Sequence, residues 1–204
     1  MTCRVLSVDE LDAAVELLSL GAVVAVPTDT VYGLAAWLAD DDAVARLALL
    51  KHRPASVPIA VLCATAQDAK ELAAAWPSGA VVLADRFWPG ALTIVVPVER
   101  ALARRVGAER GVGLRVPADD TCRALLARTG PLAVTSANLH GEAPASTALG
   151  VQRAFRDEQL TAVLDDGPRT GTVSTVVDLA GDPPAVLREG AIATIDVLAA
   201  LRGA

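Results

Sequence analysis

Hydrophobic and polar positions alternate between strand-like and helix-like patterns along the whole chain. Short β-branched runs predict strands at 23–26, 57–63, 91–96, 113–116, 132–135, 162–164, 173–179 and 185–187. Ala- and Leu-rich stretches predict helices between Asp9 and Gly21 and at 42–50, 65–76, 119–128 and 195–201. Asp9 and Thr65 are the candidate N-caps of two of these helices.

This alternation of strands and helices favours an α/β layer fold. After residue 160 the strands follow one another with little helix between them, which favours a mixed sheet over a purely parallel one. No repeat, low-complexity tract or long linker divides the sequence. We therefore expect a single domain over residues 1–204.

The composition excludes two broad classes of protein. Hydrophobic residues make up 53% of the chain and charged residues 21%, which is not the composition of a disordered chain. The 18 basic residues against 24 acidic ones give a net charge of −6, which disfavours a general nucleic-acid binder. Only two of the basic residues are lysines, Lys51 and Lys70, so each lysine stands out.

The cysteines and the N-terminus favour a cytoplasmic protein. The N-terminus has no basic region followed by an apolar run, and no apolar stretch reaches the ~18 residues of a membrane span. Cys3, Cys63 and Cys122 are far apart and odd in number, which fits neither a disulfide framework nor a Cys-x-x-Cys metal site. We expect three reduced thiols and no membrane segment.

The motifs of several common active sites are missing from the sequence. It contains no Gly-x-x-x-x-Gly-Lys-Ser/Thr phosphate loop, no Gly-x-Gly-x-x-Gly after a strand and no Gly-x-Ser-x-Gly nucleophile elbow. His52 and His140 have no Cys or carboxylate at metal-ligand spacing. No metal site in the protein itself is predicted.

Polar residues gather instead where predicted strands give way to loops, as binding residues of α/β folds usually do. The first cluster is 27–34, in which Thr28, Asp29, Thr30 and Tyr32 follow the first buried strand. The alternative for this cluster is a turn that merely caps a following helix.

The second cluster, Lys51-His52-Arg53-Pro54, ends a predicted helix. Positive charge at a helix C-terminus is favourable in itself, which is the structural alternative. A Lys ammonium beside an Arg fork also suits a polyphosphate ligand.

Two further clusters follow predicted strands. Arg115 lies among apolar strand residues, so its guanidinium needs either an internal carboxylate or the carboxylate of a ligand. The segment 134–138, with Ser146 beyond it, offers small hydroxyls, an amide and backbone N–H groups that can bind phosphate or ribose. A plain Asn/Ser turn is the alternative for this last cluster.

Taken together and in this order, the clusters resemble the YrdC-type threonylcarbamoyl-AMP synthases. The matching segments run from residue 27 to 192 and read PTDTVYGL, KHRPASVPIAV, FWPGALTIVVP, VGLRVP, TSAN, STVVD and LREGAI. The resemblance implies a twisted, open mixed sheet with flanking helices around a large concave cavity. It also implies a nucleotidyltransferase that joins L-threonine, bicarbonate or CO2, and ATP into L-threonylcarbamoyl-adenylate, with release of pyrophosphate.

The resemblance also implies roles for individual residues. Lys51 and Arg53 match a Lys-x-Arg pair that would hold the ATP phosphates, and they are the expected catalytic residues. The other expected nucleotide-binding residues are Ser136, Ala137, Asn138, Ser146 and Arg188. The expected threonine-binding residues are Thr28, Arg115, Thr135 and Ser174. Arg115 would bind the threonine carboxylate, and Mg²⁺ would accompany ATP.

This chain departs from the family pattern at three places. His52 stands where the family commonly has Gly, and Gly111 stands where a Thr often precedes the strand that carries Arg115. Residues 145–147 read Ala-Ser-Thr where Ser-Pro-Thr is usual. These departures affect individual contacts rather than the implied reaction.

The implied mechanism needs no covalent protein intermediate: a carbamate of threonine attacks the α-phosphorus, and positioning and charge neutralisation supply the catalysis. The product would pass to tRNA-modification proteins for threonylcarbamoyladenosine synthesis. Two rival functions stay open. One is a non-catalytic RNA-binding module that uses the same concave surface. Weak RNA binding is also an open alternative for the enzyme itself. The other is a carbamoyl-transfer relative that works on a different carbamate, as in larger hydrogenase-maturation proteins with a YrdC-like domain.

Overall fold

The strands hydrogen-bond into one mixed sheet in which parallel and antiparallel neighbours alternate irregularly. The computed structural model describes residues 3–52, 57–158, 160–169 and 171–203. Within these ranges the strands are β1 (Arg4–Ser7), β2 (Val24–Val26), β3 (Gly33–Trp37), β4 (Ala60–Leu62), β5 (Leu92–Val96), β6 (Val112–Arg115), β7 (Leu132–Ser136), β8 (Ala162–Asp165), β9 (Thr175–Asp178) and β10 (Ala185–Arg188). Their order across the sheet is β1-β8-β2-β3-β7-β4-β6-β5-β9-β10. The mixed α/β sheet expected from the sequence is confirmed.

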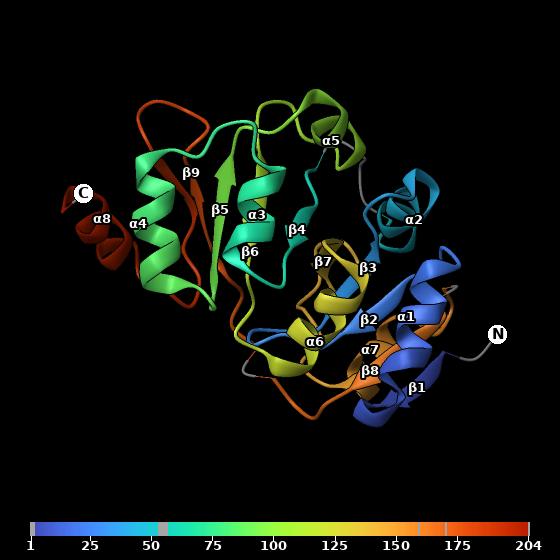
Figure 1. The fold of residues 1–204 in the computed structure, drawn as a ribbon. Coiled ribbons are helices and arrows are strands. Elements are labelled where there is room, and N and C mark those ends of the chain that lie inside the picture. The colour runs from blue at the N-terminus through green and yellow to red at the C-terminus, as the bar shows by residue number, and fades with distance from the viewer. Residues whose placement is uncertain (1–2, 53–56, 159, 170, 204) are drawn as a thin grey trace.

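Helices flank the sheet on both faces. They are α1 (Leu11–Ser19), α2 (Asp41–Leu50), α3 (Ala66–Leu72), α4 (Ser78–Phe87), α5 (Arg100–Arg105), α6 (Asp120–Thr129), α7 (Ala148–Ala154) and α8 (Thr194–Arg202), with a 3₁₀ turn over Val8–Glu10 before α1. In Figure 1, α4 and α8 lie beside β5 and β9, at the opposite end of the molecule from α1 and α7. Each end of the sheet therefore has its own helical cover.

The core follows from the alternation of side chains along each strand. On β2, Val24 and Val26 pack in the cluster that holds the buried residues of α1 and α6, whereas Ala25 packs with those of α2 and α7. Successive residues of a strand point to opposite faces, so a strand covered by helices on both sides must be apolar throughout. This explains why β2 is buried at every position.

At the other end of the sheet only one strand face carries core residues. Leu92 and Ile94 of β5 and Leu114 of β6 belong to the core, which includes the buried residues of α3, α4 and α8. The alternate residues, among them Thr93 and Arg115, line a cavity on the opposite face. Because successive side chains point to opposite faces, β5 and β6 pack against the core with one face and line the cavity with the other.

Five elements were not predicted: β1, β3, α4, α5 and α7. The alternative for the 27–34 cluster included a following helix, and this part of it is wrong, because β3 follows instead. The β3 sequence GLAAW has no β-branched residue, so its local preference gives no strand signal. Pairing with β2 on one side and β7 on the other overrides that preference.

Two predicted helix limits also differ from the structure. Asp9 lies inside the 3₁₀ turn rather than capping α1. The predicted 65–76 helix ends at Leu72, because Ala73 forms an antiparallel bridge with Val98. The Thr65 cap is confirmed, since its side chain accepts a hydrogen bond from the Asp68 N–H.

The three cysteines, Cys3, Cys63 and Cys122, are free thiols. Among the described residues, no helix has the length and the apolar run needed to cross a membrane.

The turn after β10 presses closely against the segment that precedes β9. A Cβ atom on Gly190 would lie 2.3 Å from the Val173 carbonyl oxygen and 2.6 Å from that of Ser174. The Ala191 N–H donates to the same Val173 oxygen at 2.9 Å. Only glycine permits this approach, and it sets the position of Val173 and Ser174, which both line the cavity.

We expect Gly190→Ala to lower the free energy of unfolding by about 2 kcal/mol, since backbone atoms cannot yield as side chains do. Gly203→Ala is the control, because a Cβ there meets nothing closer than 3.8 Å. Urea denaturation of both variants measures the difference. Equal stability of the two variants would show that the contact at Gly190 is not as tight as described.

Candidate functional site

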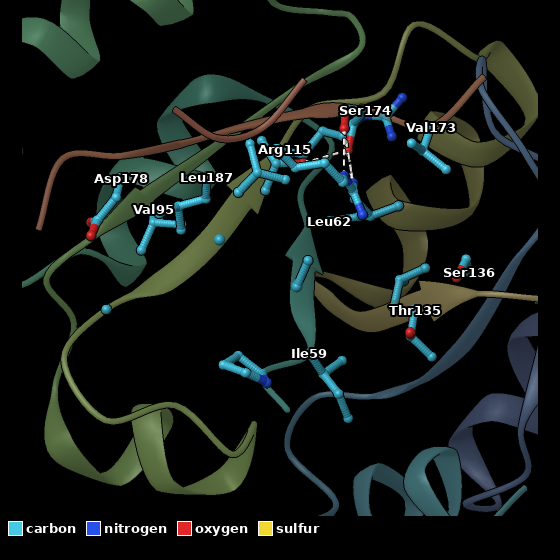
Figure 2. Close-up of a pocket in the computed structure, with 18 of the residues that line it drawn as sticks. Ile59, Leu62, Val95, Arg115, Thr135, Ser136, Val173, Ser174, Asp178 and Leu187 are labelled. Atoms are coloured by element: carbon cyan, nitrogen blue, oxygen red, sulfur yellow. Dashed lines mark hydrogen bonds between the residues drawn. The ribbon is translucent and has the colours of Figure 1, made fainter. Parts of the chain in front are cut away.

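A cavity of about 540 Å³ opens between the two ends of the sheet. Its lining comes from β3, β4, β5, β6, β7, β9 and β10, from the loop after β2 and from the segment between α5 and β6. In Figure 2, Thr135 and Ser136 lie on one side of the cavity, Val95 and Asp178 lie on the other, and Arg115 lies between them. A cavity of this volume is within the range of ordinary small-molecule sites.

Arg115 is the central charged residue of the cavity and is only 5% exposed. Its Nε donates to the Gly90 carbonyl oxygen at 2.9 Å, Nη1 donates to Thr30 Oγ1 at 3.1 Å, and Nη2 donates to Asp29 Oδ1 at 2.6 Å. Burial lowers the pKa of the guanidinium, and the Asp29 charge opposes this effect. The internal salt bridge that the sequence left as one alternative is therefore present.

These bonds leave Arg115 able to bind a ligand as well. A guanidinium has five N–H donors, and three are used by the described residues. Nη1 and Nη2 each retain one N–H, and Arg115 lines the cavity. The two alternatives drawn from the sequence, an internal carboxylate and a ligand carboxylate, are compatible.

The loop after β2 is built by the hydroxyl of Thr28. Thr28 Oγ1 accepts hydrogen bonds from the N–H groups of Thr30 and Val31 and donates to the Val31 carbonyl oxygen at 2.6 Å. The 27–34 cluster therefore does contain a turn, as one alternative held, but the turn leads into β3 and not into a helix. It sets Asp29 and Thr30 against Arg115.

Lys51, which directly follows α2, is buried and contacts Ser136, a residue of the cavity wall. Its Nζ donates to the backbone oxygen of Ser136 and, at 3.1 Å, to Asn138 Oδ1. Ser136 Oγ donates to the same Asn138 oxygen at 2.6 Å. The predicted Lys51, Ser136 and Asn138 are thus brought together, whereas Arg53 lies outside the described residues.

A hydroxyl pair forms another part of the cavity wall. Thr93 lies on β5 and Ser174 directly precedes β9, and their hydroxyl oxygens are 2.9 Å apart. Arg188, across from Val176 on β10, donates to the Ser174 carbonyl oxygen through both Nε and Nη2. Partial burial lowers the pKa of Arg188, and the positive charge of Arg115 lowers it further.

The structure places most of the predicted site residues in or against one cavity. The lining includes Thr28, Arg115, Thr135, Ser136, Ser174 and Arg188. Lys51 and Asn138 lie directly behind Ser136. Ala137 and Ser146 are not lining residues; their backbones bond to Tyr32 and Arg169 instead.

The sequence analysis missed a second ion-pair network beside the cavity. Arg169 Nη2 donates to Asp119 Oδ2 at 2.9 Å and to Asp166 Oδ2 at 2.7 Å, and its guanidinium lies over the Tyr32 ring. The backbone N–H of Gly171 donates to the Thr30 carbonyl oxygen. The segment between β8 and β9 is thereby fixed to the loop after β2.

The network perturbs two titratable groups. Burial raises the pKa of Asp119, and Arg169 opposes this rise. Burial also raises the pKa of Tyr32 to about 12, and its hydroxyl donates to the Gly167 carbonyl oxygen at 2.8 Å. In the sequence, Arg169 sits in an Asp-Gly-Pro-Arg turn that gave no sign of a buried pairing.

Two departures from the family pattern have structural explanations. His52 has φ of 51°, a left-handed backbone conformation that favours glycine, and its imidazole lies 2.8 Å from Glu158. A Cβ on Gly111 would lie 2.7 Å from Ala180 Cβ and 2.9 Å from the Val96 oxygen. The backbone at His52 thus keeps the conformation suited to glycine, and position 111 has no room for a side chain.

Comparison with known proteins matches residues 16–190 to the Sua5/YciO/YrdC family, whose description reads "Telomere recombination". The chain belongs to this family, as its motifs indicated. A relative from Mycobacterium tuberculosis, which carries the provisional name threonylcarbamoyl-AMP synthase, is 39% identical over 184 residues. The match covers 89% of this chain and 84% of the relative.

Two longer relatives give the same assignment of family. The threonylcarbamoyl-AMP synthase of Bacillus subtilis is 38% identical over 187 residues, or 90% of this chain and 54% of the relative. The crystal structure of Pyrococcus abyssi Sua5 complexed with L-threonine matches with a TM-score of 0.91 and 32% identity. That match covers 98% of this chain and 61% of the Pyrococcus chain. This chain therefore spans little more than half of these two proteins.

We expect Arg169→Leu to lower the free energy of unfolding by about 3 kcal/mol at pH 7, because it leaves the buried carboxylate of Asp119 unpaired. Without Arg169 the pKa of Asp119 rises further. A buried Asp with a raised pKa destabilises the fold only when it is ionised. The loss of unfolding free energy caused by Arg169→Leu should therefore become smaller as the pH falls through the pKa of Asp119 and the carboxylate is protonated. Urea denaturation at pH 7 and pH 4.5 measures this dependence.

The matched control is Arg153→Leu, which removes an exposed arginine from α7. Its effect should stay within about 0.5 kcal/mol at both pH values. A loss for Arg169→Leu that is the same at pH 7 and pH 4.5 would contradict the assigned pairing with Asp119.

Proposed function

We propose that the protein synthesises L-threonylcarbamoyl-adenylate from L-threonine, bicarbonate and ATP, with release of pyrophosphate, for the threonylcarbamoyladenosine modification of tRNA. The observation that carries the proposal is Arg115, which lines a cavity bounded by hydroxyls and keeps two N–H donors that no described residue uses. The L-threonine complex of the structurally similar Pyrococcus protein supports an amino acid as one ligand of such a cavity.

The threonine end of the proposed site is the Arg115 end. One N–H on each terminal nitrogen of Arg115 suits the two oxygens of a carboxylate, the strongest pairing that a guanidinium makes. Asp29 already uses one donor, so it holds the guanidinium in place. We assign the threonine side chain and amino group to the hydroxyls of Thr135 and Ser174, with Thr28 shaping the loop.

The phosphate end is the Lys51 end. Lys51 Nζ donates to the backbone oxygen of Ser136 and to Asn138 Oδ1, which places its ammonium group next to a residue of the cavity wall. We assign the polyphosphate to the Lys51 ammonium group and keep Arg53, which lies outside the described residues, as its proposed second cation. Ala137, Ser146 and Arg188 remain proposed nucleotide contacts.

Mg²⁺ enters this proposal as part of its substrate, the MgATP complex. The described residues contain no group of three His, Cys, Asp or Glu side chains placed to hold a metal ion. Mg²⁺ prefers oxygen ligands such as those of a polyphosphate, and the ion usually keeps several of its own waters. The protein cations and the ion would together offset charge on the departing pyrophosphate.

The chemical step we propose is attack by a carbamate oxygen of threonine on the α-phosphorus, with pyrophosphate leaving in line. The residues that line the cavity include hydroxyls and arginines but no Cys or His among the described positions. A direct displacement needs no protein nucleophile, and alignment alone can supply ~7–11 kcal/mol of the barrier reduction. In the proposed mechanism, Asp29 orients Arg115 and Thr30.

The experiment incubates the protein with ATP, Mg²⁺, bicarbonate and each amino acid in turn and measures pyrophosphate. We expect release with L-threonine and none above background with the other amino acids. Lys51→Met should cut threonine-dependent release at least tenfold, equivalent to about 1.4 kcal/mol of barrier, because it removes the charge and keeps the chain length.

The control is Lys70→Met, which changes the other lysine, exposed on α3, and should keep the wild-type rate. Circular dichroism of the Lys51→Met protein checks that the buried position tolerates methionine. If no amino acid gives pyrophosphate release, the proposed function is overturned. If the protein then bound duplex RNA in a strongly salt-dependent way, the RNA-binding module would replace it.

A further inference from the structure

Two buried ion pairs lie next to each other behind the cavity. One joins Arg115 to Asp29 at 2.6 Å and the other joins Arg169 to Asp119 at 2.9 Å, and none of the four side chains is more than 15% exposed. Burial lowers the pKa of Arg115, and the charges of Asp29 and Asp119 both oppose that shift. Solvent screens such buried charges only weakly, so each pair acts on the other.

The Asp119 carboxylate is fixed at the start of α6. Its Oδ1 accepts a hydrogen bond from the Cys122 N–H at 2.8 Å, and its Oδ2 accepts one from Arg169. Burial raises the pKa of Asp119, the Cys122 N–H and Arg169 lower it, and the charges of Asp166 and Asp29 raise it again. In the described ranges, Arg169 is the one cation that forms a salt bridge with Asp119.

Several contacts hold the Arg169 guanidinium in this place. Its Nη1 donates to the Asp166 carbonyl oxygen at 2.6 Å, and its backbone N–H donates to the Ser146 carbonyl oxygen at 2.8 Å. The guanidinium carbon lies 5.8 Å from the centre of the Tyr32 ring. The positive charge of Arg169 is therefore kept at Asp119.

The charge balance around Arg115 depends on this arrangement. The two guanidinium groups and the carboxylates of Asp29 and Asp119 cancel in charge before a ligand binds. Asp166 is partly exposed and adds a negative charge that solvent screens in part. Without Arg169, a ligand carboxylate would approach Arg115 against an excess of buried negative charge.

We propose that Arg169 is a positioning residue for threonine binding, which neutralises Asp119 and so leaves Arg115 available to the substrate carboxylate. This inference rests on the proposed function, in which the threonine carboxylate binds Arg115. Arg169 is not among the residues that line the cavity, so it acts through the charge balance and not by contact with threonine. Asp29 then remains the one protein carboxylate that Arg115 has to share.

The test measures the KM for threonine and for ATP by pyrophosphate release in three variants. Arg169→Gln leaves Asp119 ionised without its cation, so we expect the threonine KM to rise at least tenfold and the ATP KM to stay within twofold of wild type. Asp119→Asn removes the negative charge and still offers an oxygen to the Cys122 N–H, so its threonine KM should stay within twofold. The double variant Arg169→Gln/Asp119→Asn should return to within threefold of the wild-type threonine KM.

A role of Arg169 in packing alone predicts a different pattern. In that case Asp119→Asn by itself would raise the threonine KM, and the double variant would be no better than Arg169→Gln. Either result, or an unchanged threonine KM in Arg169→Gln, overturns the proposal.

Circular dichroism shows whether each variant folds. If Arg169→Gln does not fold, the double variant decides, because it lacks the unpaired buried charge. A threonine KM near wild type in the double variant supports the proposal. A tenfold rise there, or a double variant that does not fold, shows that the contacts of Arg169 matter and not its charge, and overturns the proposal.

Arg128→Gln is the matched control. Arg128 of α6 forms an ion pair with Asp12 of α1, and neither residue lines the cavity. Loss of this pair should leave the KM values for threonine and ATP unchanged. A threonine KM raised tenfold in this variant too would show that the effect is not specific to Arg169, which contradicts the proposal.

The two proposals fail in different ways. Wild-type protein that releases no pyrophosphate with threonine contradicts the proposed function itself. Wild-type protein that is active with threonine, paired with an Arg169→Gln variant of unchanged threonine KM, contradicts the role of Arg169 alone.

Discussion

The need to satisfy one buried guanidinium organises the cavity. Arg115 ends β6 with almost no exposure to solvent, and an unpaired charge in that position would cost several kcal/mol. Its partners Asp29, Thr30 and Gly90 come from two loops far apart in the sequence. Placing this residue therefore fixes the loop after β2 and the loop before β5 against β6, and leaves two N–H donors toward the cavity.

The rest of the site depends on that frame. The segment between β8 and β9 is fixed to the same loop by Gly171 and by the Arg169 network, and it delivers Ser174 to the cavity. Gly190 allows the turn after β10 to approach closely, which brings Arg188 to Ser174. An acidic chain can thus place the guanidinium groups of Arg115 and Arg188 in its cavity, because each is held by its own contacts with neighbouring loops and strands.

The sequence predicts the strands with β-branched residues and the helices with clear caps, and its ordered motifs indicate the family. It does not predict β3, whose GLAAW sequence becomes a strand only because β2 and β7 pair with it. For the site, charged residues in apolar strands, such as Arg115, are visible in the sequence. Thr93 is not, because one Thr in a β-branched strand carries no signal until the fold brings Ser174 within hydrogen-bond distance of it. The ion pair of Arg169 is not visible in the sequence for a similar reason, because its partner Asp119 is 50 residues away.

The central claim, that Arg115 is held ready for a substrate carboxylate, can be tested on the unaltered protein. Isothermal titration calorimetry would compare L-threonine with L-threonine amide, which lacks the carboxylate and keeps the rest of the molecule. Because a carboxylate pairs with a guanidinium far better than a neutral amide does, the account predicts at least tenfold tighter binding of threonine. Equal affinity for the two ligands would contradict it.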